Sequence, residues 1–159
     1  MKTITTYLLV LFTSISFAQN IDFKASNFKD NKDGLKAATE QISQGDEKLK
    51  QGERVITNAQ AAKIHFSAAL THYLQAQAFN PSNAELNYKI GYCYLNTHNK
   101  SKAVSHLEKA NELNASVANN LPLLLAQSYQ YTLKFDEAIK YYNLYKSSLG
   151  SGALDNQKK

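Results

Sequence analysis

The sequence predicts an all-helical protein assembled from helical hairpins, and three observations support this. Prolines and glycines number only 2 and 6 in 159 residues, too few for the many tight turns of an all-β chain. Apolar residues recur three and four positions apart over stretches of about 12–16 residues, which is typical of amphipathic helices. A pattern of small and apolar residues also returns at intervals of about 34 residues. Helices of this kind bury their apolar stripes only by pairing.

The chain opens with the pattern of a secretory signal peptide in residues 1–18. A positive start precedes an apolar run over 7–17, and the small residues Ser16 and Ala18 precede a cut before Gln19. An uncleaved membrane anchor is the alternative, but the run is about 11 residues long and a spanning helix needs about 20. The pattern favours export and cleavage, and no Cys stands at the cut to carry a lipid anchor.

The rest of the chain divides into a lead-in, three helical hairpins and a tail. We predict a flexible lead-in over 19–34, hairpins over about 35–83, 84–118 and 119–149, and a flexible tail over 150–159. The first hairpin carries about 12 residues more than the interval allows. Because residues 55–65 are rich in Ala and Gln, we expect most of the excess to lengthen the second helix of that hairpin.

The middle hairpin shows the repeated pattern most clearly. Gly91 and Ala103 are small residues that let its two helices approach closely, and Tyr94 and Leu107 fill the space beside the crossing. The pattern returns about 35 residues later at Ala126, Tyr129, Ala138, Tyr142 and Tyr145. It is also present about 34 residues earlier, at Ala69, Tyr73, Ala76 and Pro81.

On these residues the chain resembles the tetratricopeptide repeat (TPR) family, which implies an all-α TPR solenoid of about three helix-turn-helix repeats. Three positions depart from the family pattern. Asn87 stands where the family often has Trp, and Ala115 replaces the usual Pro. Pro122 falls in the first turn of a predicted helix, where no intrahelical N–H bond is lost.

A narrower resemblance, over about 35–148, is to the N-terminal TPR module of exported OmpA-family envelope proteins. Its most characteristic pieces are Asn80-Pro81, 87–91 (NYKIG) and 135–139 (FDEAI). This resemblance implies a periplasmic location, association with the outer membrane, and docking onto envelope machinery of the secretion or motility type. The sequence printed here contains neither the propeller-like segment nor the peptidoglycan-binding domain of those proteins, so peptidoglycan binding is not carried over.

Charge and cysteine usage narrow the function classes. The net charge of +5 is a mild excess, and the basic residues are interleaved with acidic ones instead of forming the stripe of a nucleic-acid binder. No stretch after the signal peptide is apolar enough to span a membrane. Cys93 is the one cysteine, so no intramolecular disulfide is possible. Its apolar surroundings favour burial, with an intermolecular bridge as the alternative.

Residues that could carry chemistry are scarce. His65 and His72 are seven positions apart, about 10.5 Å along a helix, which is too far to share one metal ion directly. His98 and His106 fall in a predicted turn and on the helix after it. No nucleophile motif, phosphate-binding glycine loop or metal-ligand spacing occurs. We therefore expect no catalytic residues, no metal and no cofactor, and do not expect an enzyme.

Binding of a partner is the function that the sequence favours. In stacked hairpins the first helices line a concave face. The residues predicted to face that groove are Glu85, Tyr88, Lys89, Tyr92, Asn96, Leu123, Gln127, Gln130 and Tyr131. Such aromatic and amide groups suit an extended peptide or a helix. Packing of Tyr88 and Tyr92 against the next hairpin is an equally weighted interpretation.

Two functional hypotheses follow. The first is a non-catalytic scaffold that binds a protein or peptide of the cell envelope through this groove. The second is a structural protein that associates with itself through exposed ends of the repeat array, since no polar capping helix follows Leu149.

Overall fold

The structure is a computed structural model that describes residues 19–155, with side chains described as far as Gly150. The predicted signal peptide, residues 1–18, lies outside the described residues, as do residues 156–159. The prediction of an all-helical chain is confirmed for 19–155, which contain six α-helices and no strand. The helices are α1 (Lys32–Arg54), α2 (Ala59–Phe79), α3 (Ala84–Leu95), α4 (Ala103–Leu113), α5 (Leu121–Tyr131) and α6 (Phe135–Asp155), with short 3-10 helices η1 (Ala25–Asn27) and η2 (Lys100–Lys102).

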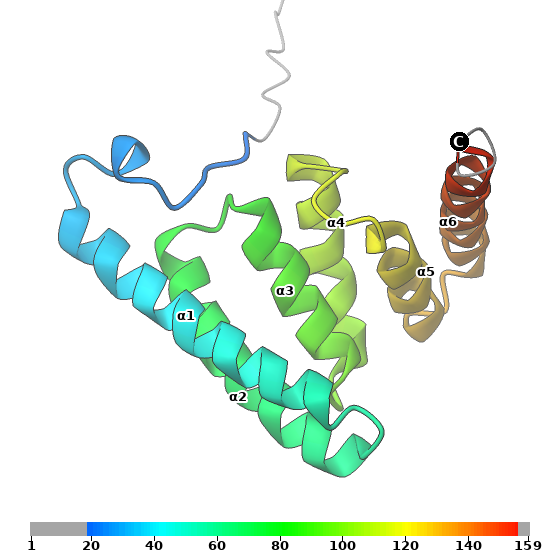
Figure 1. The fold of residues 1–159 in the computed structure, drawn as a ribbon, viewed down its shortest axis with the longest axis horizontal. Coiled ribbons are helices and arrows are strands. Elements are labelled where there is room, and N and C mark those ends of the chain that lie inside the picture. Colours follow the sequence, from blue (N-terminus) through cyan, green and yellow to red (C-terminus); the bar gives the residue numbers. More distant parts are fainter. Residues whose placement is uncertain (1–18, 156–159) are drawn as a thin grey trace, which may run out of the picture.

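The helices pack as consecutive pairs. α1 packs on α2, α3 on α4 and α5 on α6, and the pairs meet through α2 with α3 and through α4 with α5. Figure 1 shows the three pairs side by side in chain order, with α6 at one end of the row. The first helices of the second and third pairs, α3 and α5, also contact each other directly.

Asparagine side chains begin the first three helices. The side-chain oxygens of Asn31, Asn58 and Asn83 accept hydrogen bonds from backbone N–H groups three residues later, at 3.0, 3.1 and 2.9 Å. Each bond satisfies one of the donors that a helix start leaves without an intrahelical acceptor. These caps explain why α1, α2 and α3 start where they do.

Glycine permits close packing within the first two pairs. A Cβ on Gly91 would lie 2.5 Å from Cγ of Leu107, and a Cβ on Gly45 would lie 2.5 Å from Cε1 of Tyr73. Real side chains do not approach so closely, so α3 and α4, like α1 and α2, are spaced for glycine. The predicted approach of Gly91 to the Leu107 side of its hairpin is therefore present in the structure.

The first pair is long in both of its helices, which differs from our expectation. We expected most of the extra residues in the second helix. Instead α1 spans 23 residues and α2 spans 21, against 12 for α3 and 11 for α4. Residues 55–58 form the turn between them. Near this turn Gly52 of α1 faces the ring of Phe66 on α2, so the added turns of each helix bury apolar surface against the other.

The lead-in is docked onto the fold, which differs from the flexible segment that we expected. The side-chain amides of Asn80 and Asn83 both donate to the carbonyl of Ile21, at 2.8 and 3.0 Å. The N–H of Ile21 donates to the carbonyl of Ser82 at 2.7 Å. Phe23 lies 6.4 Å from Phe79, ring centre to ring centre. Hydrogen bonds and aromatic packing thus hold this segment to the turn between α2 and α3.

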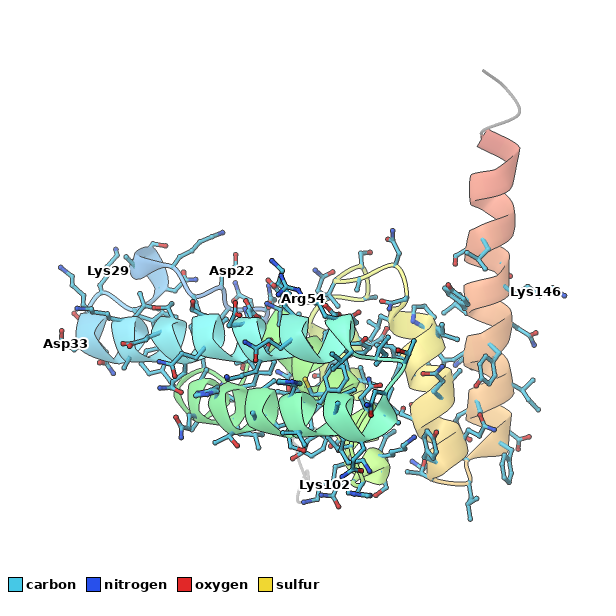
Figure 2. The ribbon with its side chains drawn as sticks, turned by 60° about the horizontal axis from the view of Figure 1, so that its bottom comes forward. Asp22, Lys29, Asp33, Arg54, Lys102 and Lys146 are labelled. Atoms are coloured by element: carbon cyan, nitrogen blue, oxygen red, sulfur yellow. The ribbon has the colours of Figure 1, made fainter. Side chains whose placement is uncertain are left out.

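The C-terminal boundary also differs from our expectation. We predicted a flexible tail from residue 150, but α6 continues as a helix to Asp155. Figure 2 shows the C-terminal half of α6 standing clear of α5. The added turns therefore gain little from packing within the described chain.

Two further expectations concern the interior and the membrane. Cys93 is fully buried in the core, in line with the burial that its surroundings predicted, and burial raises the pKa of its thiol. Across residues 19–155, no helix combines the length and the apolar character that crossing a bilayer requires.

Candidate functional site

The main candidate site is a groove between α3 and α5. We define the central groove as the hollow of about 430 Å³ lined by Tyr92, Leu95, Asn96, Lys100, Leu124, Gln127, Gln130, Tyr131 and Tyr142. α3 and its C-cap Asn96 supply the first three of these residues and α5 supplies four, while η2 and α6 close the two sides. The helical spacing of Gln127, Gln130 and Tyr131 places them on one side of α5. The groove therefore combines aromatic rings with side-chain amides.

Polar groups in the central groove are available to a ligand. Among the described residues, whose side chains end at Gly150, no group forms a hydrogen bond with the side-chain amide of half-buried Gln127 or with the hydroxyl of Tyr92. The amide of Asn96 donates to the carbonyl of Tyr92 at 2.9 Å, which leaves its side-chain oxygen as an acceptor. A Gln side chain offers both a donor and an acceptor, which matches the needs of a peptide backbone.

Other groups of the groove hold its walls in place. Nζ of Lys100 lies 3.0 Å from the hydroxyl of Tyr131 and 4.6 Å from the centre of its ring. The hydroxyl of Tyr142 donates to Oε1 of Gln130 at 3.0 Å. These contacts join η2 to α5 and α6 to α5, so the groove is braced on both sides before any ligand binds.

Tyr92 serves both the core and the groove. Its ring meets Phe66 of α2 edge to face, with ring centres 5.7 Å apart. Burial, with a smaller contribution from the charge of Glu53, raises the pKa of its hydroxyl. The ring is therefore a fixed plate, and the hydroxyl remains a hydrogen-bond donor at neutral pH. Tyr92 thus lines the central groove, and its packing contact is with the preceding pair, not with the next hairpin.

A second hollow contains the other predicted residues of α3. This end hollow, of about 370 Å³, is lined by Asn20, Asp22, Asn83, Ala84, Glu85, Tyr88, Lys89, Asn114, Ser116 and Val117. The hydroxyl of Tyr88 donates to Oδ1 of Asn120 at 2.8 Å and ties α3 to the start of α5. Burial raises the pKa of that hydroxyl. Here Tyr88 packs between hairpins, which is the second of its two predicted roles.

The charge of Lys89 is neutralised within the fold. Its Nζ lies 2.8 Å from Glu85 and 2.9 Å from Asp46 of α1. Burial alone would lower the pKa of Lys89, but hydrogen bonds and charge attraction from Glu85 and Asp46 outweigh burial, so the pKa is raised. Asp46 also accepts from the hydroxyl of fully buried Tyr73 at 2.6 Å. Asp46 thus links α1 to both α2 and α3, and Lys89 serves this internal network instead of a ligand.

The structure divides the nine predicted groove residues into three groups. Tyr92, Asn96, Gln127, Gln130 and Tyr131 meet in the central groove, whereas Glu85, Tyr88 and Lys89 lie in the end hollow. Leu123 is half-buried and lines neither hollow.

Sequence reasoning missed four residues of the central groove. They are Leu95, Lys100, Leu124 and Tyr142. Lys100 lies in a segment that we interpreted as a break between helices, and nothing in its local sequence marks it. Tyr142 was assigned to the hairpin crossing. Tyr142 is the equivalent of Leu107 but belongs to the last hairpin, which no further hairpin follows in the predicted array. That position was the one signal in the sequence that the ring of Tyr142 would be exposed.

The site shows no arrangement for metal-dependent chemistry. Within the described part of the chain, no group of three or more His, Cys, Asp or Glu side chains is close enough to hold a metal ion. Lys100 is the one charged residue among those that line the central groove. What the groove presents is therefore hydrogen-bonding and aromatic surface.

Comparisons of the chain with protein-family models, with curated proteins and with solved structures find no match. The interpretation of the central groove therefore rests on its own geometry.

Proposed function

We propose that this chain is a non-catalytic TPR-type scaffold whose central groove binds a segment of a partner protein. The observation that carries the proposal is a pair of groups in the groove, the Gln127 amide and the Tyr92 hydroxyl. Neither has a hydrogen-bond partner among the side chains described as far as Gly150, and both lie between braced aromatic rings. Amide and hydroxyl groups can bond the backbone of an extended segment, and Tyr rings can bury its side chains.

The TPR assignment has its own support. Consecutive helices pack in pairs, and the first helices of neighbouring pairs touch. Gly45 faces Tyr73, and Gly91 faces Leu107, at equivalent places in the first and second pairs. A repeated contact of this kind is what a repeat protein requires.

The location that we propose is the periplasm, in association with the outer membrane. It is supported by the signal-peptide pattern of residues 1–18 and by the resemblance to OmpA-family TPR modules. The partner would then be an envelope protein or peptide, with neither a nucleic acid nor a cofactor involved.

Site-specific crosslinking in the producing cell tests the groove. A photoreactive amino acid replaces Tyr131, which is 50% exposed in the groove, or Leu74, which is 37% exposed on α2. We expect a discrete adduct from position 131 and none from position 74. Adding Gln127→Ala should reduce the adduct several-fold, whereas Gln75→Ala, which removes an exposed amide of α2, should leave it unchanged. Equal labelling at both positions, or insensitivity to Gln127→Ala, would contradict the proposal.

A further inference from the structure

α6 presents an apolar stripe that is largely uncovered within residues 19–150, with only Tyr142 bonded to α5. Phe135, Ile139 and Leu149 are 57, 59 and 58% exposed, and Tyr142 is 37% exposed. Their spacing of four, three and seven residues places them on one face of the helix. Lys146 falls on the same face, and Figure 2 shows it pointing away from α5. We call these five residues the α6 stripe.

The first pair shows what happens to such a face inside the row. Phe66 and Leu70 on α2 stand 69 residues before Phe135 and Ile139, at the equivalent places, and both are buried. α3 packs on α2, and its Tyr92 ring meets the ring of Phe66. The α6 stripe is thus a surface of the kind that a neighbouring helix covers on α2. Scattered exposed apolar residues need no explanation, but an aligned stripe marks an interface.

We infer that the α6 stripe is the contact between two copies of this chain, with the two α6 helices antiparallel about a twofold axis. The stripe is symmetric about Tyr142, because Phe135 stands seven residues before it and Leu149 seven residues after it. An antiparallel copy centred on Tyr142 places Phe135 opposite Leu149 of the second copy, and the reverse. The same residues of both copies therefore form the interface, as a twofold axis requires.

Charge supports the same arrangement. Asp136 lies in the first turn of α6 and Lys146 lies ten residues later. In the antiparallel pair, Lys146 of one copy comes within about half a turn of Asp136 of the other. Parallel packing would instead bring the two Asp136 side chains together.

Stacking of the first pair of one copy on the α6 of another is disfavoured. None of the large exposed apolar residues among the described side chains lies on α1. Its exposed positions carry groups such as Lys36, Glu40 and Glu47. Burying these charges against the α6 stripe would leave them without water or a partner. The association that we infer therefore closes at two copies and does not extend into a filament.

The oligomeric state of the full chain tests the inference. A single helix pair buries little area, so we expect a monomer–dimer equilibrium visible by sedimentation between about 1 µM and 1 mM. Ile139→Asp should raise the dissociation constant by about tenfold or more. The matched control is Ile64→Asp, since Ile64 is 64% exposed on α2. It should leave the equilibrium unchanged. Circular dichroism checks that both variants stay folded.

A charge exchange tests the orientation. Asp136→Lys and Lys146→Asp should each weaken the dimer, and the double variant should restore it, because the two charges meet between copies. A monomer at all concentrations, or a dimer indifferent to Ile139→Asp, would overturn the inference. A dimer that Ile139→Asp disrupts but the double variant does not restore would overturn the antiparallel arrangement. Because Tyr142 also lines the central groove, these measurements use the purified chain without a groove ligand, so they fail or succeed independently of the proposed function.

Discussion

Leu133 adopts a backbone conformation that suits glycine. It has φ of 60° and follows the C-terminus of α5. The N–H of Lys134 donates to the carbonyl of Tyr129 at 2.9 Å, and the N–H of Leu133 donates to that of Gln130 at 3.2 Å. These two bonds are those of the Schellman motif, which closes many helices and usually has Gly at the left-handed position. A Cβ there costs about 1–2 kcal/mol.

Leu133→Gly should therefore stabilise the chain by about 0.5–1 kcal/mol, because relief of strain exceeds the entropy that Gly adds to the unfolded state. Little packing is lost, since Leu133 is 73% exposed. Urea unfolding followed by circular dichroism measures the change. Leu133→Ala is the matched control, because it removes the same side chain but keeps the Cβ, and it should give no gain. If the Gly and Ala variants were equally stable, the backbone at residue 133 would not be strained by a Cβ.

For single residues, the sequence predicted the structure correctly where the helical spacing of apolar residues alone decides whether a side chain is buried. The small residue at Gly91 and the burial of Cys93 follow from their places on an apolar helical face. The left-handed Leu133 could not be foreseen, because the sequence carries no Gly or Asn at that position. Such a conformation results from the geometry that joins two helices and runs against the preference of the residue itself.

Among the elements, three helices meet at one hydrogen-bonded cluster. Nε2 of Gln77 on α2 donates to Oδ1 of Asn87 on α3 at 2.8 Å. The same amide nitrogen lies 3.1 Å from Nδ1 of His106 on α4. An amide nitrogen can only donate, so Nδ1 of the neutral imidazole accepts this bond when the ring proton is on Nε2. Oδ1 of Asn87 also lies 3.4 Å from Nδ1. The ring of His106 also stacks on Tyr94, with centres 5.5 Å apart.

This cluster should make stability fall in mild acid. Burial lowers the pKa of His106 from its ordinary value of 6.5. The unfolded chain therefore binds a proton first, and folding stability is lost as the pH falls below about 6.5. Urea midpoints measured at pH 7 and pH 5 should show the loss. In His106→Gln, whose side-chain oxygen can accept from Gln77 but which cannot titrate near these pH values, the drop in stability should be smaller. If the variant lost as much stability between pH 7 and pH 5 as the parent chain, the pH dependence would come from groups other than His106.

Sequence reasoning captured the helix pairing but not every boundary. The asparagine caps at Asn31, Asn58 and Asn83 are local signals that are readable in the sequence. Docking of the lead-in was not readable, because Asn80 and Asn83 bond a carbonyl 59 and 62 residues earlier in the chain. The length of α1 also depended on contacts with α2 that no local propensity reports.

For the whole molecule, packing is strongest at the start and weakest at the end. Six side chains of α2 are buried, and Phe66 and Tyr73 among them are fully buried. On α6, Ala138 is the one buried side chain as far as Gly150. Since each pair meets only its neighbours across the main interfaces, stability need not be uniform along the row.

Hydrogen exchange should follow this gradient. At low micromolar concentration, where the proposed dimer is dissociated, amides of α6 should exchange at least about tenfold faster than those of α2 and α3. Exchange followed by peptide mass spectrometry resolves the helices. Higher protein concentration should slow the exchange of α6 selectively if the α6 stripe is covered. Uniform protection of all six helices would instead indicate a single cooperative unit.

The residues of the central groove were predictable only in part. Gln127, Gln130 and Tyr131 were found because position on a first helix decides whether a residue faces the groove. Lys100 and Tyr142 were missed because their places depend on how a turn and a neighbouring helix fold over that face. Helical periodicity predicts which residues share a face of one helix. It does not predict how the next turn or helix packs against that face.

The arrangement in consecutive pairs has a consequence for how such a chain can change. The loop between α4 and α5, residues 114–120, joins two pairs that meet where α5 packs on α4, α3 and η2. A duplication or loss of a whole pair at such a junction would have to be accommodated at that interface, while the internal packing of the other pairs is retained. The length of the row, and with it the length of the groove, can therefore vary more freely in evolution than the packing inside any pair.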